Sequence, residues 1–496
     1  MSLIPLRLKS NSFYKPKSNV VLVVENLNAN EINNFGSIFK TDVLFGYYQF
    51  ANIGKVKNGS FASEIKIYDL NFKYLRSISI ETIKKTKVIS LIYNGNAFMV
   101  TLLGSGTNEL LAFSNDGNKL GEKKGISKTQ SCSYYTLGNY GFMRKETLRN
   151  GMKLGSVLKA FNNNLELLWS IETDENINDK IHIVYSSRKY FGFVRTDAPS
   201  GLFENDYESS LVFVYSKTGN ELFELRSKKI KNSLISSYHL DEENKILNLG
   251  GYSFKNGTND VEGFCLINFD FDGKVINERR VSFAEELKSI TTVTYNKKVI
   301  DNVPIYIHKF HWDSEGKIYI VAEQFKSFHL NFYIDINDLS SLFQGKNRVV
   351  IFNLAYLIFD KDFKLLKNNI VEKKYSYADF PSPIGKVLSD FETSISYPLD
   401  RYFGYQFSYV NEGGNQLTTI YREFEKYKKI DNVKSNEIIG SMEINNGNVS
   451  LGRINLRSYP SKLKILPAKK NHLLLLYSQQ FVIKNKLTIA MEPLVQ

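Results

Sequence analysis

Two β-hairpin patterns alternate along this chain, and they constrain its fold more than any other feature. In the first pattern, a β-rich run ends in an aromatic or apolar residue, turn-forming residues follow, and a second apolar run begins. Asparagine, aspartate and glycine favour the turn because they hydrogen-bond their own backbone or tolerate a positive φ. The copies of this pattern lie at residues 63–80, 108–125, 156–172, 210–228, 264–283, 355–373 and 417–435.

The second pattern has a different turn and a nearly continuous apolar character. It begins with a degenerate copy at Phe39–Ile53, and its other copies lie at residues 88–103, 133–146, 181–196, 235–254, 305–325, 395–410 and 462–481. Two hairpins in succession predict a four-stranded antiparallel blade. We assign the second pattern to the inner strand pair of each blade. The more polar, Lys-rich first pattern suits the outer pair, where charge protects an exposed edge.

The hairpin count predicts an all-β protein of eight blades, with seven as the alternative if residues 39–53 do not form a full hairpin. Only one strand-like run follows Phe481, at residues 486–494, and a spare apolar run at residues 20–27 precedes the first hairpin. We expect these two terminal runs to pair, which would complete the last blade and close the ring. The chain is then a single domain spanning residues 1–496.

This repeat resembles the β-propeller superfamily over nearly the whole chain. The segment from Asp313 to Tyr319, with sequence DSEGKIY, is similar to the inner-hairpin turn of many propellers. The Gly-His and Trp-Asp signature of WD40 blades is absent, and so is the Ser-x-Asp-x-Gly-x-Thr-Trp box of sialidase-type propellers. The Asn-, Lys-, Ile-, Tyr- and Phe-rich composition resembles envelope proteins of Bacteroidota, some of which dock propellers onto outer-membrane machinery.

The net charge and the apolar runs limit which partners and which cellular location are expected. The net charge is +13, which favours anionic partners, although no basic stripe indicates a nucleic-acid track, so we predict no nucleic-acid partner. No apolar run approaches the length that spans a bilayer, which leaves peripheral membrane association as the alternative. The N-terminal residues do not resemble a secretory signal. We expect a periplasmic or extracellular protein whose signal is missing from this chain, with a cytoplasmic protein as the alternative.

Four long segments are expected as inserted loops that share one face of the propeller. They are residues 195–209, 284–304, 327–353 and 433–461, and a short helix is predicted within the third, at Asp338–Gln344. Binding residues concentrate on loops that a rigid scaffold carries. We therefore predict that this face binds a protein partner, with aromatic anchors at Phe203, Phe332, Tyr333 and Phe343.

Known catalytic and metal-binding motifs are missing from the sequence. His308 and His311 are predicted to point to opposite faces of a strand and to be structural. The run from Asp270 to Gly273 lacks the further ligands of a calcium loop. Glu323, Glu204 and Asp206 are the carboxylates that would serve a glycosidase. We predict no catalytic residues, no metal site and no cofactor.

The sequence therefore favours a non-enzymatic protein-interaction module, belonging to a bacterial envelope or secretion assembly. Two alternatives stay open. One is a carbohydrate-binding or carbohydrate-active propeller that acts on an anionic glycan, and the other is an intracellular scaffold.

Overall fold

The structure of the chain is a computed structural model that describes most of its strands and many of the connecting turns. The described residues are 21–25, 35–40, 43–56, 59–82, 86–103, 107–127, 132–150, 153–173, 179–197, 208–226, 233–255, 261–330, 345–382, 403–411, 416–424, 428–429, 437–445, 447–456, 462–469, 472–480 and 485–493. Within them α1 (Lys288–Thr291) is the sole helix, and the all-β prediction is confirmed.

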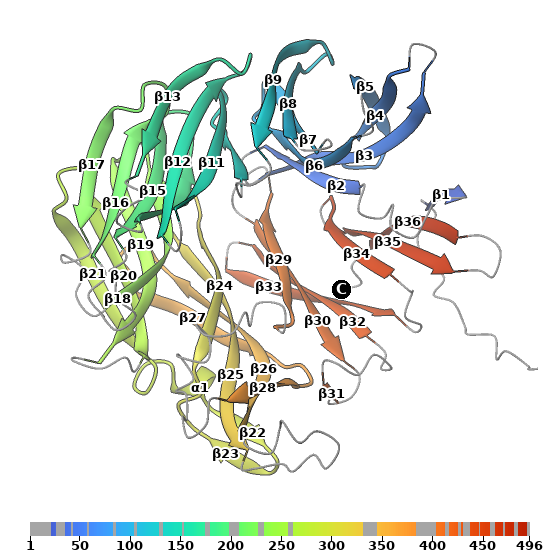
Figure 1. Ribbon diagram of the computed structural model, residues 1–496. Coiled ribbons are helices and arrows are strands. Elements are labelled where there is room, and N and C mark those ends of the chain that lie inside the picture. Colours follow the sequence, from blue (N-terminus) through green and yellow to red (C-terminus); the bar gives the residue numbers. More distant parts are fainter. Residues whose placement is uncertain are drawn as a thin grey trace, which may run out of the picture. The chain divides into compact units, whose positions relative to one another are not determined.

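The chain divides into two compact units, Asn34–Glu286 and Met1–Asn33 with Leu287–Gln496. Figure 1 shows the strands of both units, coloured along the sequence. A single domain across residues 1–496 stays a prediction.

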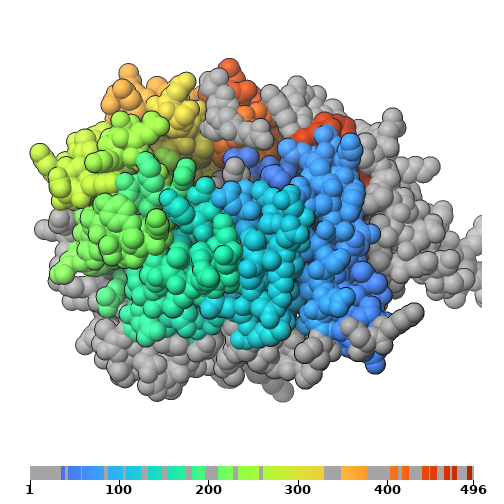
Figure 2. Space-filling model, turned by 90° about the horizontal axis from the view of Figure 1, so that it is seen from above, coloured from blue at the N-terminus to red at the C-terminus, as the bar shows by residue number. Residues whose placement is uncertain are grey.

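The unit Asn34–Glu286 consists of consecutive four-stranded antiparallel sets, each built from two hairpins. The strands are β2 (Phe35–Lys40), β3 (Val43–Lys55), β4 (Phe61–Tyr68), β5 (Tyr74–Thr82), β6 (Lys87–Tyr93), β7 (Ala97–Leu103), β8 (Thr107–Ser114), β9 (Lys119–Ser127), β10 (Cys132–Leu137), β11 (Gly141–Asn150), β12 (Lys153–Asn162), β13 (Leu167–Glu172), β14 (Asp179–Ser186), β15 (Tyr190–Asp197), β16 (Glu208–Tyr215), β17 (Glu221–Arg226), β18 (Ser233–Asp241), β19 (Ile246–Phe254), β20 (Val261–Asp270) and β21 (Val275–Ser282). Consecutive segments lie side by side in chain order, from blue through cyan to green (Figure 2).

Apolar cores fill the space between neighbouring sets of this unit. Ile65 of β4 and Phe98 of β7 share one cluster, and Met143 of β11 and Phe191 of β15 share another. Because the strands alternate their side chains between two faces, each set contributes one face to the core before it and one to the core after it. The near-continuous apolar character of the inner hairpins follows from this two-sided burial.

The other unit contains the remaining strands. They are β1 (Val21–Glu25), β22 (Val293–Tyr295), β23 (Lys298–Ile300), β24 (Ile305–Trp312), β25 (Ile318–Leu330), β26 (Gly345–Phe359), β27 (Leu365–Val371), β28 (Ser376–Ser382), β29 (Tyr405–Val410), β30 (Gln416–Phe424), β31 (Lys428–Lys429), β32 (Glu437–Asn445), β33 (Asn448–Leu456), β34 (Lys462–Pro467), β35 (His472–Gln480) and β36 (Asn485–Pro493). The predicted pairing of the terminal runs is confirmed, because β1 pairs antiparallel with β36 from Val21–Ala490 to Glu25–Lys486.

The predicted number of blades requires a correction. Over the described residues, hydrogen bonds join the strands into six sheets of four or more strands, not into eight or seven separate blades. The hairpin pattern predicts the number of four-stranded sets. Hydrogen-bonded bridges between neighbouring sets join some of these sets into larger sheets. One such bridge is parallel and links Lys40 of β2 to Tyr93 of β6. Closure of a ring stays a prediction.

Three segments differ from their predicted structures. The expected hairpin at residues 417–435 is wrong, because β30 pairs with β32 instead. The expected loop at residues 433–461 is wrong for the same reason, since it contains β32 and β33. The expected loop at residues 327–353 is wrong where it is described, because β25 and β26 continue into it as paired strands.

The other two predicted loops differ less. Residues 284–304 hold α1 and the small β22–β23 hairpin. Residues 198–207 of the segment 195–209, the predicted helix Asp338–Gln344 and the first half of the hairpin at residues 395–410 lie outside the described residues.

Five hairpin turns share one hydrogen-bond pattern. Each begins with an Asp or Asn whose Oδ1 accepts the backbone N–H groups two and four residues later, as Asp360 does from Asp362 at 3.0 Å and Lys364 at 2.7 Å. Asp270, at the start of the calcium-like run, makes the same two bonds. Turn chemistry therefore accounts for its aspartate.

The fourth residue of this turn adopts a positive φ, which normally selects glycine. Gly273 and Gly316 follow that rule, but Phe72, Leu165 and Phe363 occupy the same position at φ values of 62°, 62° and 66°. Leu165 and Phe363 are 2% and 1% exposed. Burial of these side chains offsets a left-handed conformation that costs roughly 1–2 kcal/mol per residue.

The balance between side-chain burial and backbone strain predicts an unusual order of stability for two variants of Phe363. Phe363→Gly should destabilise the protein less than Phe363→Ala, by about 1 kcal/mol, because both lose the buried ring but only alanine keeps the strained backbone. Phe191 is 0% exposed and has no positive φ, so it is the matched control. There the glycine variant should be the less stable one, because glycine within a strand loses more conformational freedom on folding than alanine does. Urea unfolding measures both pairs, and the same order at both positions would contradict the argument.

Candidate functional site

Strands β25 and β26 extend well beyond the sheet that they share with β24 and β27. β24 accompanies β25 only as far as Gln324, whereas β26 stays paired with it as far as Leu330 and Lys346. On the other side of β26, β28 pairs from Ser376 to Ser382 in place of β27. We call this extension the stalk, defined as residues 325–330, 345–352 and 376–382.

An inserted hairpin supports one face of the stalk. Tyr295, at the end of β22, packs its ring 5.2 Å from Phe328 of β25 and 5.7 Å from Phe352 of β26. It also lies 5.1 Å from Tyr375, which precedes β28. One aromatic side chain therefore contacts residues from all three stalk segments or their flanks. Aromatic pairs of this kind contribute about 0.5–1.5 kcal/mol each beyond area burial.

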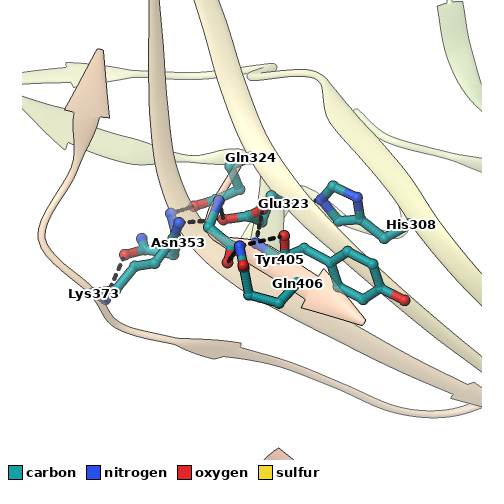
Figure 3. A network of polar contacts seen from close by, with 8 residues as sticks. His308, Glu323, Gln324, Asn353, Lys373, Tyr405 and Gln406 are labelled. Atoms are coloured by element: carbon teal, nitrogen blue, oxygen red, sulfur yellow. Dashed lines mark hydrogen bonds and ion pairs between the residues drawn. The ribbon is translucent and has the colours of Figure 1, made fainter. Parts of the chain in front are cut away.

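A buried carboxylate lies at the base of the stalk. Glu323 of β25 is 0% exposed and contacts four groups from three parts of the chain. Its Oε1 receives the Lys373 ammonium and the backbone N–H of Gly404 at 3.1 Å, and its Oε2 receives the backbone N–H of Tyr405 at 3.0 Å. The His308 Nε2 lies 3.0 Å from Oε2. We call Glu323, Lys373, His308 and the 404–405 backbone the ionic latch (Figure 3).

A β-bulge places the histidine of the latch. The β24–β25 register shifts between Ile307 and Lys309, so His308 is the extra residue of the bulge. Bulges redirect side chains, and here the imidazole meets Glu323 and stacks on Tyr405 with ring centroids 4.4 Å apart. His311 stacks on Tyr319, which shares a face of β25 with Glu323. The prediction that His308 and His311 point to opposite faces is therefore wrong.

Amide side chains connect the latch to the segments around it. A second register shift, between Glu323 and Phe325, leaves Gln324 outside the regular ladder. Its Nε2 donates to the carbonyl of Ile290 in α1 at 2.7 Å. The Asn353 Oδ1 accepts the backbone N–H of Lys373 at 3.3 Å. Gln324 and Asn353 lie beside the latch (Figure 3), and their amides connect its surroundings to α1 and to the backbone of Lys373.

A second carboxylate, Glu423 of β30, has a weaker partner. The Arg453 guanidinium lies 3.3 Å from its Oε2, without hydrogen-bond geometry, and that side chain is 52% exposed. Burial raises the pKa of Glu423, and the nearby Arg453 and Lys373 charges offset this only in part. For Glu323, burial also raises the pKa, but Lys373 and His308 outweigh it and hold the pKa at about 2.

The latch is built to hold two sheets together. Through Lys373 and the 404–405 backbone, Glu323 joins the β24–β27 sheet to the strand β29. A carboxylate that is 0% exposed and bound by a lysine, a histidine and two amides has no lone pair directed at solvent. Over the described ranges, no group of three His, Cys, Asp or Glu side chains is arranged to hold a metal ion.

The structure does not describe the positions of the predicted partner-binding residues. Phe203, Phe332, Tyr333 and Phe343 lie outside the described residues, as do Glu204 and Asp206. The segment that contains Phe332, Tyr333 and Phe343 leaves β25 at Leu330 and enters β26 at Gly345. The sequence singles out Glu323 and His308 separately, but it does not predict their contact or the partners Lys373 and Gly404, because neither bulge has a sequence signal of its own.

Antiparallel four-stranded sets, stacked in series through shared apolar cores, make this chain a β-propeller protein. Its residues 118–494 match the Family of unknown function (DUF6770), and the chain belongs to that family. No curated protein is similar to it in sequence.

Several solved structures are similar to this chain at 9% sequence identity. The WD40 domain of SCAP from fission yeast has a TM-score of 0.38, covering 96% of this chain and 98% of that one. The Dos1 propeller has a TM-score of 0.39, with 93% and 96% covered. The β-propeller domain of the Trilobed protease from Pyrococcus furiosus has a TM-score of 0.37, with 84% and 93% covered. In the part of the chain that is described, no helix has the length and apolarity to cross a membrane.

The two carboxylates should respond oppositely to neutralisation. At pH 7, Glu323→Gln should lower the free energy of unfolding by about 3–5 kcal/mol, because Lys373 is left buried without its counter-charge. Glu423→Gln should be neutral or stabilising by up to about 1 kcal/mol, because it removes a charge whose burial is poorly compensated. Denaturant unfolding of both variants measures this difference, and equal losses would contradict it.

The two carboxylates should also change the free energy of unfolding with pH in opposite directions. A lowered folded-state pKa means that Glu323 stabilises the fold above its unfolded pKa, near 4.5, and loses this as pH falls towards 2. A raised pKa means that ionised Glu423 disfavours the fold, so the benefit of Glu423→Gln should grow as pH rises through 4.5. Unfolding measured between pH 4 and 8 should show the gain for Glu423→Gln, and a gain that shrinks with rising pH would contradict the sign.

Proposed function

We propose that this protein is a non-enzymatic protein-interaction module that presents the segment 331–344 to a partner from the end of its stalk. The observation that carries the proposal is the β25–β26 ladder of the stalk, which is continuous from Phe325–Ile351 to Leu330–Lys346 and so holds the strands on either side of this segment in register. Interfaces depend on a few aromatic anchors, and the segment contains Phe332, Tyr333 and Phe343.

The base of the stalk supports this assignment. A binding segment on a rigid support loses less conformational entropy when its partner binds. Tyr295 packs against two stalk segments and against Tyr375, which precedes the third, and Gln324 connects the base to α1. The stalk is supported by the inserted β22–β23 hairpin and by a third strand, β28. Such support favours a role in recognition over a role as a mere connection between β25 and β26.

The setting that we propose is a bacterial envelope or extracellular assembly, on the grounds of composition. A glycan-directed enzyme is less well supported, because Glu323 is fully buried and already neutralised by Lys373. A general acid must reach the atom that it protonates. Phe203, on a different segment, stays a candidate partner-binding residue.

Replacing the three aromatic residues tests the proposal directly. The variant Phe332→Ala, Phe343→Ala, Tyr333→Ala should lose its partner by at least tenfold in affinity capture from native cells with quantitative mass spectrometry, because hot-spot truncations cost about 2 kcal/mol or more each.

A matched control replaces three exposed apolar residues elsewhere. Leu167, Val275 and Leu366 are 54%, 42% and 52% exposed on β13, β21 and β27. Their alanine variant should capture the partner as well as the unmodified protein does. Full capture by the aromatic variant, or equal loss in both variants, would count against the stalk as the binding site.

A further inference from the structure

The inserted hairpin β22–β23 places its turn beside the outer part of the stalk. Tyr295, the last residue of β22, packs its ring 5.2 Å from Phe328 of β25. Val293 and Phe352 belong to the same apolar cluster, so apolar packing anchors the hairpin to the stalk. Phe328 lies three residues before the segment 331–344. The turn that follows Tyr295 is therefore close to the point where the stalk ends.

The turn of this hairpin is strained at a lysine. Asn296 and Lys297 connect Tyr295 to its partner Lys298, and their φ values are 50° and 63°. A two-residue turn with positive φ at both positions favours asparagine followed by glycine. Lysine stands in the place of the glycine, although a side chain disfavours the left-handed backbone. Phe363 offsets such strain by burial, whereas Lys297 is exposed. Strain that burial does not offset is characteristic of functional positions.

The tip of the hairpin exposes positive charge next to an apolar side chain. Lys297 and Lys298 are both exposed, and Val299, at 67%, is more exposed than any other large apolar side chain among the described residues. Residues 293–300 contain no acidic residue. Asp301 accepts a hydrogen bond from Thr292 at 2.8 Å, at the opposite end of the hairpin. Across the part of the chain that the structure describes, neither lysine has an ion pair.

Strain alone does not identify a contact surface. Lys245 is also exposed and also has a positive φ, of 56°. Its turn contains Glu242 and Glu243, so that turn is net acidic. The β22–β23 turn instead combines strain with positive charge, an exposed apolar side chain and a position beside the stalk.

We propose that Lys297, Lys298 and Val299 form a second contact surface for the protein that binds the stalk, and that this surface takes an acidic segment of that partner. The inference rests on the proposed function, which supplies the partner. Exposed ammonium groups attract carboxylates and accelerate association with an acidic protein. A protein is favoured over a phosphate group, because planar, bidentate recognition of phosphate favours arginine. Arg348 of β26 does not belong to this surface, since Asp379 stands opposite it on β28.

The variant Lys297→Gly, Lys298→Gln tests the surface in the full-length protein. At low salt it should bind a fluorescein-labelled hexaglutamate peptide about fivefold more weakly in fluorescence anisotropy, because two attractions are lost. Added salt should remove the difference. The urea midpoint of Lys297→Gly alone should rise, because glycine relieves the left-handed backbone. A lysine that served only the fold would not combine a gain in stability with a loss of binding.

The matched control is Lys245→Gly, Lys274→Gln, which removes two exposed charges from turns of the unit Asn34–Glu286. It should bind the peptide within about twofold of the unmodified protein. Lys245→Gly alone should also raise the urea midpoint, since its backbone is left-handed too. The control therefore separates the position of the charge from both the net charge and the strain.

Each outcome decides the proposal. No peptide binding at low salt, or an equal loss in both double variants, overturns it. A urea midpoint that falls in Lys297→Gly also overturns it, because the turn then needs its lysine for the fold. Tighter binding of phosphatidylserine vesicles or heparin fragments, lost in the same variant, overturns the assignment to a protein. Phe332, Tyr333 and Phe343 are unaltered in every variant, so failure here leaves the proposed function standing.

Discussion

The cost of burying the Glu323 carboxylate organises the unit Met1–Asn33 with Leu287–Gln496. An ion of this kind taken from water to a protein interior costs several kcal/mol even after relaxation. Here the cost is met by a lysine, a histidine and two backbone amides, which come from β24, the chain after β27 and the start of β29. None of these groups can move without leaving a charge unpaired, so the carboxylate fixes where three separate segments lie.

The position of the latch along β25 gives it a further consequence. Glu323 is the last residue of β25 to pair with both β24 and β26 in regular register, and the stalk begins two residues later. At the register shift, the side chain of Gln324 donates a hydrogen bond to the carbonyl of Ile290 in α1. Because the stalk starts next to a buried ion pair, its base is held in place by that pair. A binding segment on a rigid base loses less conformational entropy when its partner binds.

Local turn chemistry made the hairpins predictable, and packing between strands made the rest unpredictable. Asp360 and Asp270 mark turns in the sequence because their side chains satisfy the turn backbone. The failure at residues 417–435 has a local cause. The Lys- and Glu-rich run after Phe424 resembles a second strand, but the stronger hairpin signal is the Asn446–Gly447 dipeptide between β32 and β33. By contrast, the bulge at His308 depends on partners far away in the sequence, and no single-sequence pattern encodes it.

Charge follows a similar division between what a sequence states and what a fold adds. The excess of lysine after residue 450 can be counted without a structure, but its meaning depends on which residues share a face. The antiparallel pairing of β34 and β35 places Lys464 opposite Leu476, which is 0% exposed, so this lysine lies on a face of the sheet that is otherwise buried. Burial lowers the pKa of Lys464, so the fold, and not the count of charges, decides what this lysine contributes.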